Sequence, residues 1–136
     1  MLKCTYNYKV IEMELKDLSG LLKTVSHEKR LKILALLKEF DQKICVCEFV
    51  DALEMPQYQV SQHLRELRGE DIVEGERRGT WVYYSLSKSM PEEARSVVDS
   101  LTSNVEKEEI EEDIKRLNQR IARRENGKCV VGYEEE

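Results

Sequence analysis

The chain has 136 residues, of which 36% are charged and 40% hydrophobic, and this length suits one domain with a modest core. No apolar stretch approaches the roughly 18 residues that a membrane helix needs, and the N-terminus lacks the apolar centre of a signal peptide. We therefore expect a cytoplasmic protein with no membrane partner. The net charge of −5 does not exclude nucleic acid, because DNA binding depends on local rather than total charge.

Apolar residues recur at helical spacing in the first third of the chain and predict helices at residues 9–25 and 27–40. The second of these is apolar over much of its circumference, so we expect it to be the central core helix. A short helix follows at about 46–54, and Pro56 both ends it and suits the start of the next helix. Two short helices across a tight turn form the helix-turn-helix pattern, which spans residues 46–68.

The segment after this pair is first β-prone and then helical. Residues 72–87 hold two β-prone runs on either side of Arg77-Arg78-Gly79-Thr80, which predicts a two-stranded hairpin with a basic tip. Residues 91–125 are predicted to be helical and include a short heptad seam of Ile110, Ile114, Leu117 and Ile121. The pattern leaves open whether this seam pairs with a second chain or packs back on the core. Residues 128–136 are predicted to form a C-terminal tail.

The second helix of the helix-turn-helix pattern has a polar face opposite an apolar stripe. Val60, Leu64 and Leu67 fall on one side of a helical wheel and are expected to face the core. The other side and the helix N-terminus carry side chains that suit base edges, and the basic hairpin tip suits phosphates. An ordinary solvated helix face and a common surface turn are the alternatives. The predicted DNA-binding residues are Gln57, Tyr58, Gln59, Ser61, Gln62, Arg65, Arg77 and Arg78.

Several of these stretches together resemble the ArsR/SmtB family of winged helix-turn-helix repressors. Ser26–Leu37 is similar to the family's core helix, Ser61–Arg68 to its reading helix and Arg77–Leu86 to its wing. Ile44–Phe49 resembles its metal-binding box, whose hallmark is Cys-Val-Cys before an acidic residue.

The resemblance implies a mainly α fold with a small β-hairpin and a single winged helix-turn-helix domain over residues 1–127. It also implies a homodimer through the N- and C-terminal helices, at 9–25 and 91–125. A repressor of this kind binds double-stranded operator DNA and represses an operon until a ligand relieves the repression.

The chain has four cysteines, which are Cys4, Cys45, Cys47 and Cys129. In a reducing compartment cysteines are more often ligands or redox groups than structural disulfides. Thiolates select thiophilic ions such as arsenite, antimonite, cadmium and lead. On a regular helix Cys45 and Cys47 would point about 200° apart, so both can bind one ion only if the helix start is irregular.

A third thiol has to come from elsewhere in the chain. The arsenic-sensing pattern of the family often has a third cysteine three residues after Cys47, where this chain has Val50. We favour Cys4, because cadmium- and lead-sensing members complete the box with N-terminal cysteines of the other subunit. Cys129 is the alternative. The zinc site that other members carry after the hairpin is not expected, because residues 91–125 contain no histidine.

The sequence therefore predicts a repressor that leaves its operator when As(III) or Sb(III), or else Cd(II) or Pb(II), binds Cys45 and Cys47. No permanent cofactor is expected. One alternative is a thiol redox-sensing regulator of the same fold, and a second is a metal-binding thiol protein without a regulatory role. Both cysteines could also be simple packing residues. No enzyme is expected, because the chain has no Cys-x-x-Cys pair, no Gly-rich phosphate loop and no nucleophile–base arrangement.

Overall fold

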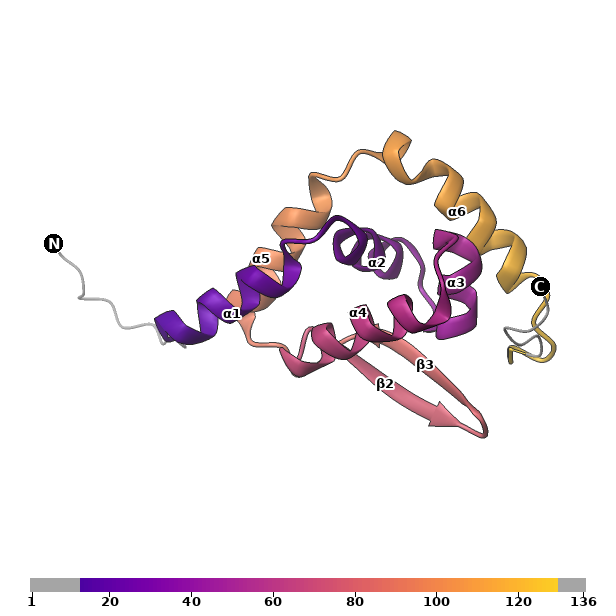
Figure 1. Cartoon of the computed structure of the whole chain (residues 1–136), viewed down its shortest axis with the longest axis horizontal. Helices are drawn as coiled ribbons and strands as arrows, with labels where there is room; N and C mark the ends of the chain where they lie inside the picture. The colour runs from indigo at the N-terminus through magenta and orange to yellow at the C-terminus, as the bar shows by residue number, and fades with distance from the viewer. Residues whose placement is uncertain (1–12, 130–136) are drawn as a thin grey trace, which may run out of the picture.

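The computed structural model describes residues 13–129 and folds them into six helices and a small three-stranded sheet (Figure 1). The predicted fold class, mainly α with a β-hairpin, is confirmed. In chain order the elements are α1 (Leu15–Val25), α2 (Glu28–Glu39), β1 (Ile44–Cys45), α3 (Val46–Leu53), α4 (Gln57–Gly69), β2 (Val73–Arg78), β3 (Trp81–Leu86), α5 (Glu92–Ser103) and α6 (Lys107–Ile121).

Local residue chemistry explains where several elements begin and end. Pro56 and Pro91 stand immediately before α4 and α5, where a fixed φ and a missing N–H cost nothing. The hairpin turn between β2 and β3 contains Gly79 at a φ of 65°, a left-handed conformation that glycine adopts without strain. The predicted helix at 9–25 begins at Leu15 in the described part, and its residues 9–12 lie outside that part.

The core forms around α2, as the sequence predicted. Ile33, Leu34 and Leu36 of this helix are fully buried. The predicted apolar stripe of α4 is also confirmed, because Val60, Leu64 and Leu67 are all 0% exposed. Burial of the stripe turns the polar face of α4 outward. None of the helices between residues 13 and 129 combines the length and apolar character that crossing a bilayer requires.

The sheet has one strand more than the predicted two-stranded hairpin. Its order is β1-β3-β2, and both neighbouring pairs are antiparallel. Cys45 of β1 lies opposite Tyr83 of β3, and Ile44 lies opposite Tyr84. A strand of two residues has no alternation of its own, so the sequence pattern could not show it. Its pairing with β3 joins the start of α3 directly to the wing.

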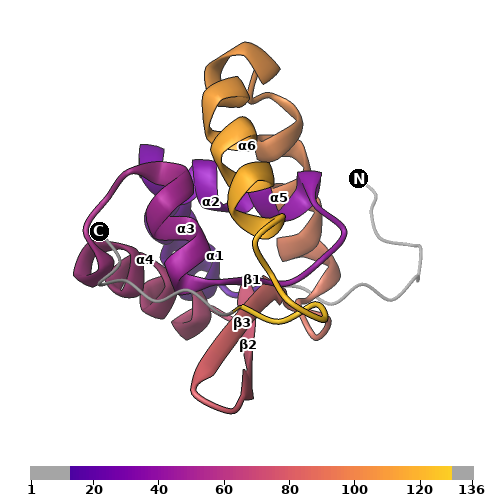
Figure 2. The same ribbon diagram turned by 90° about the vertical axis from the view of Figure 1, so that its right-hand side faces the viewer.

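The apolar seam of α6 packs back on the core of the same chain, which answers the question that the sequence left open. Ile110 is 4% and Leu117 0% exposed, and α6 lies along α3 in both views (Figures 1 and 2). An ion pair between Arg120 and Asp51, at 2.6 Å, joins the two helices. The role of 91–125 in a dimer stays a prediction.

The chain does not leave the domain after α6. Asn126 and Gly127 both have positive φ, and the backbones of Glu125 and Lys128 pair with each other. This turn brings Cys129 into the protein, where it is only 3% exposed. The predicted tail at 128–136 is therefore wrong at its start, because residue 129 belongs to the packed structure.

Candidate functional site

Cys45 and Cys47 meet because only one of them lies on a helix. Cys45 ends β1 and caps α3 in an extended conformation, with φ −91° and ψ 166°, and Cys47 lies in the first turn of α3. Their Sγ atoms are 3.1 Å apart. The predicted separation of about 200° does not apply, since it assumed two residues on a regular helix. The irregular start that a shared ligand would need is thus present before any ligand binds.

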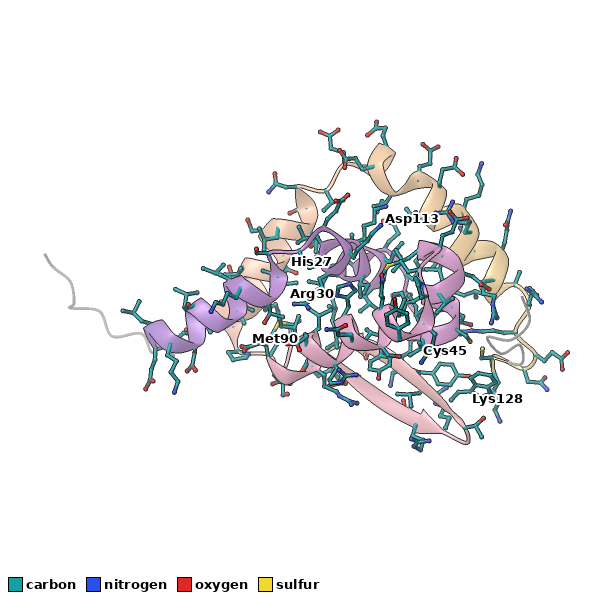
Figure 3. The ribbon with its side chains drawn as sticks, viewed as in Figure 1. His27, Arg30, Cys45, Met90, Asp113 and Lys128 are labelled. Atoms are coloured by element: carbon teal, nitrogen blue, oxygen red, sulfur yellow. The ribbon has the colours of Figure 1, made fainter. Side chains whose placement is uncertain are left out.

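Cys129 supplies a third thiol from the far end of the chain. Its Sγ lies 3.0 Å from the Sγ of Cys47, and all three sulfurs lie within 4.8 Å of one another. The cysteines are 1%, 1% and 3% exposed. Figure 3 shows Lys128, the residue before Cys129, at the same end of the molecule as Cys45. The favoured third ligand, Cys4, lies outside the described residues, and the arrangement brings the alternative, Cys129, to the pair.

A buried ion pair holds the segment that carries Cys129. The carboxylate of Glu48, on α3, is fully buried and accepts hydrogen bonds from Nε and Nη2 of Arg124, each at 2.6 Å. Arg124 also donates to the carbonyl of Lys43 at 2.7 Å, and the N–H of Cys45 donates to Glu48 at 3.0 Å. One carboxylate therefore connects the start of α3 to the C-terminal segment.

Tyr83 forms the floor of the thiol cluster. It is 1% exposed, and its phenol oxygen accepts a hydrogen bond from the backbone N–H of Cys129 at 2.8 Å. Sequence reasoning missed Glu48, Arg124 and Tyr83 as site residues. For Glu48 a signal was available, because an acidic residue three positions after a helix cap is typical of a capping box. Arg124 and Tyr83 have no such local signal.

The surroundings keep two of the thiols, those of Cys45 and Cys129, protonated. The hydrogen bond from Cys47, followed by burial and the charge of Glu48, strongly raises the pKa of Cys45. Burial is also the main cause that raises the pKa of Cys129 to about 11. Burial likewise raises the pKa of Tyr83, so its phenol is neutral near pH 7. Cys45 and Cys129 are weak nucleophiles in this state, and a thiophilic ion that binds the cluster takes the place of their protons.

The predicted DNA-binding residues lie on α4 and on the β2–β3 hairpin, which occupy the same side of the molecule (Figures 1 and 2). On α4 the exposed ones are Gln57, Tyr58, Gln62 and Arg65, whereas Gln59 and Ser61 are half-buried. Gln57 donates to the hydroxyl of Ser61 at 2.8 Å.

Both hairpin arginines, Arg77 and Arg78, are exposed. The guanidinium of Arg78 lies 5.0 Å from the ring centre of Tyr83 and 3.2 Å from a carboxylate oxygen of Glu76. The wing arginine and the thiol cluster therefore touch the same tyrosine.

Comparison with known proteins matches residues 27–75 to the family of bacterial regulatory proteins called the arsR family. The arsenical resistance operon repressor of Escherichia coli is 37% identical over 79 residues, which is 58% of this chain and 67% of that protein. The transcriptional repressor SmtB of Mycobacterium tuberculosis is 43% identical over 75 residues, 54% of each chain. The chain belongs to the arsR family.

The solved structure of reduced HlyU from Vibrio cholerae supports the same assignment for the fold. It is 31% identical to this chain, with a TM-score of 0.56, and the match covers 66% of this chain and 90% of that one. The chain is thus a winged helix-turn-helix transcriptional repressor of the ArsR/SmtB type, and its relatives are DNA-binding regulators. The matched residues 27–75 include Cys45 and Cys47 but not Cys129.

The Glu48–Arg124 pair yields a stability prediction. Replacing Arg124 by leucine leaves a buried carboxylate without its partner, and we expect the free energy of unfolding to fall by about 3–5 kcal/mol. Urea unfolding followed by circular dichroism measures this loss. Arg123→Leu is the matched control, because Arg123 is an exposed neighbour on the same turn and its replacement is expected to change little. Equal losses in both variants would contradict the assigned role of the pair.

Proposed function

We propose that the chain is a homodimeric repressor that leaves its operator when arsenite, or else another thiophilic ion, binds Cys45, Cys47 and Cys129. The observation that carries the proposal is the meeting of three buried thiols at the start of α3, all within 4.8 Å of one another. Thiolate ligands select soft ions over the hard ions that oxygen ligands prefer. The repressor of Escherichia coli that resembles this chain is named for arsenical resistance.

The charge of the site favours arsenite over a divalent ion. Three thiolates around As(III) form a neutral complex, whereas three thiolates around Cd(II) leave one negative charge in a buried site. The carboxylate of Glu48 is already buried there, and its charge is balanced by Arg124. Arg120, a second buried cation near the thiols, already pairs with Asp51. A further buried negative charge is costly unless it is paired, so the neutral complex is the better fit. Antimonite shares this advantage, and lead shares the penalty of cadmium.

Ion binding at this position reaches the DNA-reading helix through α3. Cys45 caps α3, and Phe49 and Leu53 bury the same helix against the core beside α4. Bonds of about 2.3 Å to one ion hold two sulfurs roughly 3.3 Å apart at a right angle, and farther apart at the wider angles of a tetrahedral site. The thiols, now 3.0 and 3.1 Å apart, would have to spread. By linkage, ion and operator then weaken each other equally, and a coupling of about 1–3 kcal/mol corresponds to roughly 5- to 150-fold.

The homodimer is part of this proposal. Helix-turn-helix repressors read two half-sites, whose symmetry matches a protein two-fold axis. α1 presents a row of apolar side chains to solvent, with Leu15 at 83% and Leu22 at 45% exposed. A second copy would cover this row, in agreement with the role predicted for residues 9–25.

Thiol oxidation is the second candidate, and one distance favours it. The Sγ atoms of Cys47 and Cys129 are 3.0 Å apart, so little movement separates them from a disulfide. Two thiols would lose two protons and two electrons to an oxidant such as hydrogen peroxide, which becomes two waters. HlyU from Vibrio cholerae, a structural relative, has been solved in a reduced form. Release of DNA by peroxide alone would select this function.

The reading face yields the first functional prediction. Replacing Arg65 by alanine removes a bidentate partner for guanine, and we expect operator binding to weaken by about 1–3 kcal/mol, roughly 5- to 150-fold. A gel shift at fixed salt with the upstream DNA measures this change. Arg123→Ala is the matched control, because it removes the same charge from an exposed position just after α6, outside α4 and the hairpin. Equal weakening in both variants would indicate an effect of net charge alone.

The thiol cluster yields the second functional prediction. We expect Cys45→Ser, Cys47→Ser and Cys129→Ser each to weaken arsenite binding by more than about 100-fold. Substitution of a residue that only supports a metal ligand typically weakens binding by about 10- to 100-fold, so the loss of a ligand itself should exceed this range. Cys4→Ser is the control and is expected to respond as the wild type. Titration of reduced protein on operator DNA gives the release in each variant. If arsenite released operator DNA normally from Cys129→Ser but not from Cys4→Ser, the third ligand would be Cys4. Full release of DNA from the double variant Cys45→Ser/Cys47→Ser would contradict the proposal.

The number of protons released on ion binding yields the third functional prediction. Arsenous acid condenses with three thiols and releases three waters and no proton, whereas Cd(II) must displace a proton from every thiol that is still protonated. We expect arsenite affinity to stay nearly constant between about pH 6 and 8, and cadmium affinity to rise about tenfold per pH unit for each such thiol. Calorimetric titrations at several pH values measure both. A steep rise in arsenite affinity with pH would show that the free thiols are not the reacting form.

A further inference from the structure

We infer that Tyr83 is a positioning residue that transmits the state of the thiol site to the wing, through its hydrogen bond to Cys129 and its contact with Arg78. This inference rests on the proposed ion-sensing function. It assigns the wing, in addition to α4, as an element that the ion controls.

Tyr83 belongs to the thiol cluster and not to the main core. Among the buried residues that the structure describes, Cys45, Cys47, Cys129 and Tyr83 form a group separate from the main core, with Trp81 packed against it. The neighbouring Tyr84 points to the other side of the sheet, where it joins the main core. The two tyrosines are next to each other on β3, yet only Tyr83 faces the thiols.

The backbone of Tyr83 pairs with a residue on each of the two neighbouring strands. β3 is the central strand, and Tyr83 lies opposite Cys45 on β1 and opposite Glu76 on β2. Its phenol oxygen accepts the N–H of Cys129 at 2.8 Å. A movement of either cysteine therefore acts on Tyr83 directly, by the β1–β3 ladder or by the phenol.

The ring of Tyr83 also contacts an arginine at the tip of the wing. The guanidinium of Arg78 lies 5.0 Å from the ring centre, and that of Arg124 lies 5.5 Å away. Cations within about 6 Å of an aromatic ring are attracted to it. Arg78 also contacts Glu76, which in turn pairs with Lys43, the residue before β1. The orientation of Arg78, a predicted DNA contact, thus depends on where Tyr83 lies.

Tyr83→Phe tests this inference, because it keeps the ring and the packing but removes the acceptor for Cys129. Tyr84→Phe is the matched control, with the same chemical change one residue away on the other face. We expect Tyr83→Phe to bind one arsenite per chain, because the three sulfur ligands are unchanged, and its own operator affinity without arsenite serves as the reference for this variant. The factor by which arsenite weakens operator binding is expected to fall by about two- to tenfold, which is what one hydrogen bond supplies.

A second measurement needs no DNA. We expect arsenite to shift the backbone amide signals of Arg77 and Arg78 in the wild type and in Tyr84→Phe, and to shift them much less in Tyr83→Phe. Unchanged coupling together with wild-type shifts in Tyr83→Phe would overturn the inference, and so would loss of arsenite binding in that variant, which would make Tyr83 part of the binding site. If arsenite binds the wild type and shifts the wing signals but leaves operator affinity unchanged, the proposed function fails while the contact through Tyr83 stands.

Discussion

The buried pair of Glu48 and Arg124 is the interaction on which the rest of the site depends. A carboxylate that is 0% exposed has to be paired, and Arg124 reaches it with two hydrogen bonds of 2.6 Å. The same guanidinium holds the carbonyl of Lys43, just before β1. The pair therefore holds three pieces of chain together: the start of α3, the approach to β1 and the segment after α6. Because Cys129 follows Arg124 by only five residues, the third thiol is placed by the same contact.

The family fold and the thiol site come from different parts of the chain. The match to the arsR family covers residues 27–75, which include α2, α3, α4 and the first two cysteines. α6 and the turn that buries Cys129 lie beyond this match. A common DNA-reading unit is thus combined with a C-terminal segment that completes the thiol cluster. In this arrangement α6 packs on α3, the helix that leads into α4, and the thiol cluster lies at the start of α3.

The thiol cluster and the wing share the central strand of a very small sheet. β3 pairs with the strand that ends in Cys45 on one edge and with the wing strand that ends in Arg78 on the other. Main-chain hydrogen bonds couple the three strands more rigidly than side-chain packing alone would, because each pairing fixes both position and direction. One strand therefore separates the thiol cluster from the wing strand β2.

Local patterns in the sequence determined the helices, the outward face of α4 and the wing hairpin, because these depend on periodicity and turn residues within a few positions of each other. They also identified Cys45 and Cys47, which lie in one short box. Only the tertiary structure decided the rest. The strand β1 is too short to have a pattern, and the seam at Ile110 and Leu117 could suit either a second chain or α3. The choice of Cys129 to meet the pair depends on a contact across 82 residues, for which no local pattern exists. Long-range contacts of this kind follow from the packing of α6 and the Glu48–Arg124 pair, and these form only when the whole domain folds.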